Sequence, residues 1–313
     1  MNTNLPIDVL GLGCVAVDDL VYVDSYPPAD AKVPVSRTER QCGGLTATAL
    51  VAATRLGARC AYAGVTGTDE LSSFALNAMA AEGVVLKHTQ RLPEARVVHS
   101  FIVVDSTQRT RTIFANLSGA IGAGPAWPDP EVIRSARVLF VDQFGLPGMI
   151  RAATIARDAG KPVVGDLENP DQPGFTKLLS LVDHLIVSES FALRITSQSD
   201  ISRALHELQS DRRSVVVITA GTKGCWFSGE ETDGCVRHQP AFAVDAVDTT
   251  GCGDVFHGAY AAGLALGIPL EHRILRASAA AALKATLPGG QAGIPNNATV
   301  ETFLRDRSPN FSP

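Results

Sequence analysis

The chain has 313 residues, of which 45% are hydrophobic and 19% charged, a composition typical of a well-buried globular protein. The formal net charge is −5, which argues against the basic surfaces that bind nucleic acids or membranes. No stretch approaches the roughly 18 apolar residues of a membrane span, and the first residues lack the pattern of a signal peptide. We therefore expect a cytoplasmic protein with neither nucleic-acid nor membrane partners.

The first glycines of the chain imitate a dinucleotide-binding motif. Residues 7–13 predict a buried strand, and Gly11-x-Gly13-x-x-Ala16 matches the loose glycine pattern of nicotinamide-binding folds. That pattern must open a helix, whereas residues 17–24 are rich in β-branched and aromatic side chains and predict a second strand. The sequence therefore argues against a nicotinamide site.

Two features in the first fifty residues suit the binding of a small ligand. Asp18 lies where the first predicted strand gives way to the second, where a carboxylate can bind ligand hydroxyls or simply face water in a turn. Gly43 and Gly44 precede a predicted helix over residues 46–56, so their backbone can approach a ligand closely. Thr48 lies in the first turn of that helix, where a threonine can alternatively act as a cap.

A small accessory sheet is predicted next to this region. Residues 25–42 contain several prolines and polar residues and indicate an edge or surface strand. Residues 95–105 and 111–115 form a predicted hairpin with polar side chains at every second position. Together with strands near 18–24 and 33–40, this hairpin can build a sheet with one face toward solvent or ligand.

From residue 137 onward, strands alternate with helices. The predicted strands cover 138–142, 162–166, 184–187 and 215–219, and the predicted helices between them cover 147–159, 175–182, 191–195 and 202–209. This order predicts an α/β fold with a parallel sheet covered by helices on both faces. Ligands of such sheets bind at the carboxyl ends of the strands.

The stretch with the clearest chemistry is Asp248-Thr-Thr-Gly-Cys-Gly-Asp254, which precedes a predicted helix over about 255–266. The backbone N–H groups of Gly251, Cys252 and Gly253 can form an anion site at the helix N-terminus. Asp254 beside such a site can accept a proton, and this combination is what phosphoryl transfer to a hydroxyl requires. The alternative is an ordinary helix start in which Asp254 only complements the helix dipole.

Two more glycine loops follow strands or helices. Thr219-x-Gly221-x-x-Gly224 fits either a β-hairpin turn or a nucleotide contact. The loop over 287–295, which contains Gly290, follows a predicted helix over 270–287 and can wrap a nucleotide, coordinate a monovalent cation or merely end the helix.

Taken together, these motifs resemble the ribokinase-like (PfkB) carbohydrate kinases over nearly the whole chain, and within them most closely the sulfofructose kinase and ketohexokinase branch. The resemblance rests on Gly43-Gly44 with its helix, the Gly64–Asp69 turn and the Asp248–Asp254 stretch. It implies a single ribokinase-like domain over 1–313, a doubly wound and mostly parallel sheet, and a small β lid within about 17–42 and 95–118. It also implies ATP as phosphoryl donor, Mg²⁺ as cofactor and, in some members, K⁺.

The resemblance further implies roles for individual residues. Asp254 matches the catalytic base, and Gly251, Cys252 and Gly253 match its anion hole. The positions implied for sugar binding are Asp18, Lys32, Gly44, Thr48 and Asn116, and those for nucleotide binding are Ser188, Thr219, Gly221, Gly224 and Gly290. Asp248 and Thr250 match positions that hold a monovalent cation, and Glu189 matches one that places Mg²⁺ through water.

The chain departs from the family where the acceptor binds. Thr48 stands where most members have asparagine, and Gln143 and Phe144 stand where the sulfofructose branch has an arginine. The prediction is therefore a kinase of a small carbohydrate whose identity stays open. A kinase of a nucleoside or other small alcohol and a non-catalytic sugar-binding protein are the alternatives, and apolar residues on the predicted lid leave a homodimer open.

Overall fold

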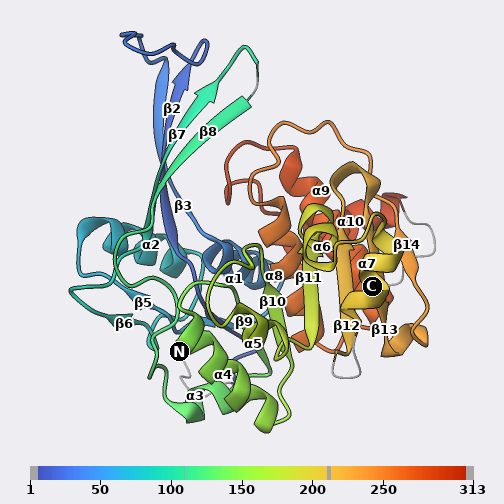
Figure 1. The fold of residues 1–313 in the computed structure, drawn as a ribbon. Helices are drawn as coiled ribbons and strands as arrows, with labels where there is room; N and C mark the ends of the chain where they lie inside the picture. Colours follow the sequence, from blue (N-terminus) through green and yellow to red (C-terminus); the bar gives the residue numbers. More distant parts are fainter. Residues whose placement is uncertain (1–5, 109, 210–212, 308–313) are drawn as a thin grey trace.

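The computed structural model of the protein describes residues 6–108, 110–209 and 213–307. An eight-stranded sheet carries helices on both faces, and a four-stranded sheet projects from one end of this body (Figure 1). The fold is the predicted α/β fold with a mostly parallel sheet. Among the described helices, none has the length and apolar character needed to cross a membrane.

The strand order of the large sheet is β14-β13-β12-β11-β10-β9-β1-β4. Six of its strands are parallel, namely β1 (Val9–Leu12), β4 (Cys60–Tyr62), β9 (Val138–Val141), β10 (Val163–Asp166), β11 (His184–Ser188) and β12 (Val215–Thr219). Two antiparallel strands, β13 (Cys225–Gly229) and β14 (Arg237–Gln239), extend one edge. The parallel strands are apolar runs because helices bury both of their faces.

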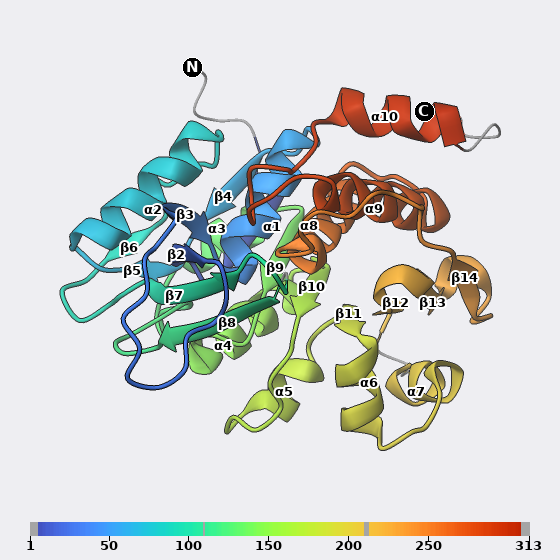
Figure 2. The same cartoon turned by 90° about the horizontal axis from the view of Figure 1, so that it is seen from above.

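Successive residues of each strand enter two separate hydrophobic cores. Val138 and Phe140 of β9 face the first core, whereas Leu139 and Val141 face the second. The first core is covered by α1 (Leu45–Arg55), α2 (Glu70–Ala81), α8 (Cys252–Ala265), α9 (Leu270–Ala285) and α10 (Asn297–Arg307). The second is covered by α3 (Pro130–Ser135), α4 (Leu146–Asp158), α5 (Phe175–Leu179), α6 (Glu189–Thr196) and α7 (Ile201–Leu208), as the view from above shows (Figure 2).

The four-stranded sheet, called the lid sheet below, has the order β3-β2-β7-β8. Its strands are β2 (Ala16–Val23), β3 (Arg37–Gly43), β7 (Val98–Asp105) and β8 (Thr110–Asn116). A separate two-stranded sheet consists of β5 (Val65–Thr66) and β6 (Gln90–Arg91), which fall between β3 and β7 in the sequence. Because side chains alternate along a strand, the register defines two faces. Asp18, Gln41 and Ser100 share the inner face, and Asp19, Arg40 and Phe101 share the outer face.

This topology bears on two of the glycine motifs in the sequence. Residues 16–23 form a strand, so the glycine pattern over residues 11–16 does not open a helix and the argument against a nicotinamide site is confirmed. The Thr219–Gly224 segment joins β12 to the antiparallel β13 and is a hairpin turn. Two short elements, α3 and α10, were not predicted.

Candidate active site

The N-terminus of α8 has the geometry of an anion site. Gly251 caps the helix with a φ of 75°, and a Cβ there would lie 2.9 Å from the carbonyl oxygen of Gly290, so the position requires glycine. The N–H of Cys252 donates to the Thr249 carbonyl at 3.2 Å. Over the part of the chain that the structure describes, the N–H groups of Gly251 and Gly253 have no protein acceptor and are available to an anion.

Asp254, in the first turn of α8, lies among other carboxylates. Burial raises the pKa of Asp254 well above its usual range, and the negative charges of Asp166, Glu168 and Asp142 add to the effect while His257 opposes it. Asp142 and Asp166 follow or end the neighbouring strands β9 and β10. A raised pKa makes this carboxylate a stronger base than an ordinary aspartate, which suits it to accept a proton at the edge of an anion site.

His257 lies one turn after Asp254 on the same helix. Its Nδ1 is 2.8 Å from the Gly253 carbonyl oxygen and 3.5 Å from Oδ2 of Asp166, and its Nε2 is 3.0 Å from the Ile186 carbonyl oxygen. Because both ring nitrogens face oxygen acceptors, a neutral ring could satisfy only one of them. Sequence reasoning missed His257, although its spacing of three residues from Asp254 placed both on one helix face.

Asp142 anchors the junction between the two sheets. Its carboxylate accepts hydrogen bonds from Cys14 N at 2.6 Å, Thr46 Oγ1 at 2.8 Å and Phe144 N at 2.8 Å. Burial raises the pKa of Asp142 to about 7. The side chain thereby joins the turn between β1 and β2, the start of α1 and the loop before α4.

Asp18 lies next to the two glycines at the end of β3. A Cβ on Gly43 would lie 2.5 Å from Oδ2 of Asp18, and Gly44 has a φ of 96° with its missing Cβ 2.7 Å from Ala16 N and the Cys14 carbonyl oxygen. Glycine is therefore required at position 44 for the backbone to approach β2, whereas a Cβ at position 43 would displace the Asp18 carboxylate. Burial raises the pKa of Asp18, and a hydrogen bond with Ser100 opposes the rise.

Thr48 and Gly290 are brought toward this region by contacts with the 287–295 loop. The fully buried Thr48 accepts a hydrogen bond at Oγ1 from Gln291 Nε2 at 3.2 Å. Gly290 N donates to Oε1 of Gln41, an inner-face residue of the lid sheet, at 3.2 Å. The glycine loop thus lies between α1, the lid sheet and the start of α8.

The other two residues implied for sugar binding lie elsewhere. Lys32 is exposed in the loop between β2 and β3, which forms the tip of the lid sheet far from α8 (Figure 1). Asn116 pairs with His99 on the outer face, opposite Asp18, and its Oδ1 accepts from Ser118 N at 3.0 Å. Together with Arg96 and His99 it lines a pocket of about 300 Å³ outside the lid sheet. The structure does not bring Lys32 or Asn116 together with Asp18.

Arg111 is a second residue that sequence reasoning missed. It lies on β8 in register with Val104, and its guanidinium Nη1 is 3.9 Å from Oδ1 of Asp248. The lid sheet therefore carries a cation to the turn that precedes the anion site. Nothing in the local sequence of residues 110–116 signalled this contact.

The residues implied for nucleotide binding gather at the carboxyl ends of β11 and β12. Ser188 and Thr219 are paired in register, and Ser188 Oγ caps α6 by accepting from Phe191 N at 3.2 Å. Gly221 and Gly224 have φ values of 56° and 89° in the hairpin turn.

Glu189, implied as a magnesium-placing residue, is held by an ion pair. Both of its carboxylate oxygens lie near Lys223 Nζ, at 2.9 and 3.0 Å. Elsewhere in the described residues no three acidic, histidine or cysteine side chains converge as a metal cage. Oδ2 of Asp166 is buried without a hydrogen-bond partner, which fits a cation brought mainly by phosphate groups and water.

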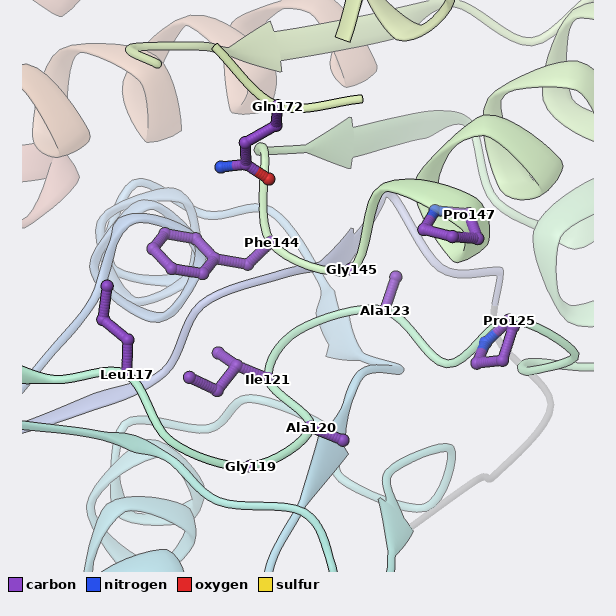
Figure 3. A pocket seen from close by; sticks show the side chains of 10 residues that line it. All are labelled: Leu117, Gly119, Ala120, Ile121, Ala123, Pro125, Phe144, Gly145, Pro147 and Gln172. Carbon is purple, nitrogen blue, oxygen red and sulfur yellow. The ribbon is translucent and has the colours of Figure 1, made fainter. Parts of the chain in front are cut away.

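A pocket of about 410 Å³ opens beside the base of the lid sheet (Figure 3). Its walls include Leu117, Ile121 and Phe144, with the polar Gln172 above them, and no basic side chain lines it. Gln143 is not among the lining residues, and its Oε1 accepts a hydrogen bond from Glu168 N at 2.7 Å. At the place where an arginine would bind a sulfonate, Phe144 therefore forms part of the pocket wall and Gln143 binds the backbone of Glu168.

Comparison with known proteins agrees with this geometry. The family model of the pfkB family carbohydrate kinases matches residues 12–297. The chain is 27% identical over 302 residues to the ribokinase of Haemophilus influenzae, covering 94% of this chain and 97% of that protein. It is also 27% identical over 321 residues to an Arabidopsis thaliana protein named probable fructokinase-4, with 95% and 96% covered. None of these names singles out the sulfofructose kinase or ketohexokinase branch.

Solved structures share the fold over the full chain. A crystal structure from Agrobacterium tumefaciens superimposes with a TM-score of 0.89 at 28% identity, covering 97% of this chain and 99% of that one. The Arabidopsis thaliana ribokinase complexed with ribose and ATP has a TM-score of 0.85 at 22% identity, with 98% and 99% covered. An Escherichia coli structure holding ATP and Mg²⁺ has a TM-score of 0.83 at 21% identity, with 97% and 100% covered.

Proposed function

The chain belongs to the pfkB family of carbohydrate kinases, and on that premise we propose that it transfers the γ-phosphoryl group of ATP to a hydroxyl of a small, uncharged sugar. The observation that carries the proposal is the position of Asp254. It follows two backbone N–H groups without protein acceptors and has a raised pKa. A base beside an anion site is useful to an enzyme that transfers a phosphoryl group and is superfluous in a protein that only binds sugar.

In the proposed reaction, Asp254 accepts the proton as the O–H bond of the sugar hydroxyl breaks. The same oxygen forms a bond to the γ-phosphorus, and the bond between the β- and γ-phosphoryl groups breaks to leave ADP. The N–H groups of Gly251 and Gly253 stabilise the negative charge that develops on the transferred group. Arg111 is placed to add a positive charge from the lid sheet.

Mg²⁺ would be bound by Asp166 and the phosphates of ATP, where it would neutralise phosphate charge. The buried Oδ2 of Asp166 supports this assignment, since it accepts no hydrogen bond and its contact with His257 Nδ1 is as long as 3.5 Å. Glu189 is the weaker candidate because Lys223 already binds both of its oxygens. Ser188, Thr219, Gly221 and Gly224 are proposed to bind the nucleotide from the ends of β11 and β12, and Gly290 from the neighbouring loop.

An uncharged acceptor is supported by the residues that replace an arginine of the sulfofructose branch. Gln143 and Phe144 stand at that place, and a sulfonate or phosphate on the sugar would need a cation to replace its hydration. Asp18, Gly44 and Thr48 are proposed to bind the sugar itself. Lys32 and Asn116 would contribute only through a different arrangement of the lid or a second chain.

A coupled assay of ADP formation tests the proposed function. We expect sugar-dependent turnover with an uncharged pentose or hexose from a panel of aldoses and ketoses. Turnover confined to sulfofructose would contradict the uncharged acceptor, and turnover confined to nucleosides would identify the alternative acceptor class. Absence of turnover with every alcohol would favour a binding protein.

Removal of the Asp18 carboxylate should weaken sugar binding. We expect Asp18→Ala to raise the KM for the sugar about 10- to 100-fold, because hydrogen bonds to a charged group contribute about 1.5–3 kcal/mol. Steady-state kinetics with varied sugar concentration measure this change. Asp19→Ala is the matched control, since Asp19 lies on the outer face and pairs with Arg40 and His99. Equal KM values for the two variants would contradict the role of Asp18.

The pH dependence of turnover should depend on Asp166. The base must be unprotonated, so kcat/KM falls as the pH drops through its pKa. Because burial and then Asp166 raise the pKa of Asp254, this fall is expected above the usual range of an aspartate. Asp166→Asn removes the neighbouring negative charge and should shift the fall to lower pH. The pH profile of kcat/KM measures the shift; Asp19→Asn should show none, and an unshifted Asp166→Asn profile would refute the coupling.

A further inference from the structure

We propose that the ammonium group of Lys284 is the resident cation of the turn Asp248–Gly251, so that this chain uses no monovalent metal ion there. The resemblance to the PfkB family implied that Asp248 and Thr250 could hold such an ion. The residues present do not fit it, and the reason lies in a lysine of α9 that the proposed reaction does not use. The inference concerns how the backbone turn before the anion site is held in place, and it rests on the proposed function only where turnover is measured.

Lys284 is fully buried in the first hydrophobic core, with 0% of its surface exposed. Lysine is almost never fully buried unless its charge is compensated. Its Nζ donates to the main-chain carbonyl oxygen of Asp248 at 2.8 Å. Burial lowers the pKa of Lys284, and the nearby Cys252, Asp248 and Asp254 oppose this change. The ammonium is therefore held beneath the turn that leads into α8.

Each of the three oxygens of Asp248 already accepts a hydrogen bond. Oδ1 of Asp248 accepts from Thr250 N at 2.8 Å, and Oδ2 accepts from Gly289 N at 2.9 Å. The main-chain oxygen of Asp248 accepts from Lys284. A metal ion at the same place would also lie next to a buried ammonium, and repulsion between like charges is strong in a poorly hydrated interior. Because Arg111 Nη1 also lies 3.9 Å from Oδ1 of Asp248, an exchangeable metal ion at this turn would face two fixed positive charges.

The position of this cation explains what it can do. The N–H groups of Val247 and Asp248 both donate to the Ala285 carbonyl oxygen, at 2.7 and 3.1 Å, so the turn is bound to the end of the helix that carries Lys284. Because Lys284 is fully buried, it has no direct access to ATP and acts through the Asp248 peptide. It is a positioning residue that orients the backbone preceding Gly251. A tethered charge cannot exchange with solvent, so the site should ignore which salt is present.

Thermal unfolding tests the proposal without any substrate. The melting temperature is measured in KCl, NaCl and choline chloride at equal ionic strength. We expect the wild type to melt within about 1 °C in all three salts, since only an ion that binds the folded state raises stability. We expect Lys284→Met, which keeps most of the side-chain volume, to melt at least several degrees lower in choline chloride and to recover part of that loss in KCl or ammonium chloride.

Arg273→Met is the matched control because it removes another buried cation from α9. Arg273 lies near the opposite end of that helix from Lys284 and pairs with Glu231. It should lose stability without recovery by any particular cation. The proposal is overturned if K⁺ stabilises the wild type over choline, if Lys284→Met melts like the wild type in choline chloride, or if no monovalent cation restores that variant. Should Lys284→Met fail to fold, the wild-type comparison still decides.

Turnover supplies a second, independent measurement. With a sugar that the wild type phosphorylates, kcat should differ less than twofold among the three salts. Activation by K⁺ of more than about fivefold would overturn the resident-cation proposal and leave the kinase assignment intact. Absence of turnover in every salt would instead count against the proposed function, while the melting temperatures would still test Lys284.

Discussion

An Asp254→Asn enzyme is expected to lose about 10²–10⁴-fold in kcat while it keeps most of its affinity for the sugar. Asparagine has nearly the shape of aspartate and cannot accept the hydroxyl proton, and general base catalysis typically contributes a factor of this size. The backbone N–H groups of Gly251 and Gly253 are unchanged in the variant, so binding of the phosphoryl group should persist. The coupled assay measures kcat, and calorimetry with the sugar measures affinity.

The stability of the same variant distinguishes loss of chemistry from loss of fold. Burial and the charge of Asp166 raise the pKa of Asp254, so the folded state favours the protonated carboxyl group. That preference stabilises the protein at low pH and is lost as the pH rises through the folded-state value. At neutral pH, Asp254→Asn should therefore unfold no more easily than the wild type. Unchanged kcat would rule out Asp254 as the base, and a large drop in melting temperature would make the kinetic result uninformative.

The second large effect is expected where α1 crosses α8. A Cβ on Gly258 would lie 2.1 Å from the carbonyl oxygen of Ala49, which is part of the α1 backbone and cannot rotate away. Gly258→Ala should therefore destabilise the fold by about 3 kcal/mol, in the upper range for overpacking, even though alanine favours helix formation by about 1 kcal/mol. The two helices would have to separate, which moves Thr48 and Asp254 apart.

Gly253→Ala in the same helix is the matched control for stability. Its Cβ would meet no atom within 4 Å, so the free energy of unfolding should be unchanged or slightly increased. Urea unfolding followed by circular dichroism measures both variants. If Gly258→Ala and Gly253→Ala unfold at the same urea concentration, the close approach of α1 and α8 does not limit the fold.

Repeating patterns made most of the fold predictable. The apolar runs of β9, β10, β11 and β12 and the helices between them were visible in the sequence, because strands buried on both faces consist mainly of apolar residues. The glycines before Asp254 marked the start of α8 for a similarly local reason. Strands, helices and helix starts, which depend on a short window of sequence, were therefore predicted well.

Contacts between distant segments were not predictable in this way. Lys284 falls in a predicted helix, and nothing near it in the sequence indicates that its ammonium group donates to the Asp248 carbonyl oxygen. The ion pair of Lys223 with Glu189 joins residues separated by 34 positions. Asn116 was expected beside Asp18, but the register of β7 with β8 places it on the outer face. The register, rather than the composition of the strand, determines which face a residue occupies.

The lid sheet has a consequence for how the two substrates affect each other. It carries Asp18, which we propose binds the sugar, and through Gln41 and Arg111 it also contacts Gly290 and approaches the carboxylate of Asp248, beside the site proposed for ATP. A shift of this sheet on binding one ligand would therefore change the surroundings of the other. Such coupling is reciprocal, so if the sugar increases the affinity for ATP by some factor, ATP must increase the affinity for the sugar by the same factor.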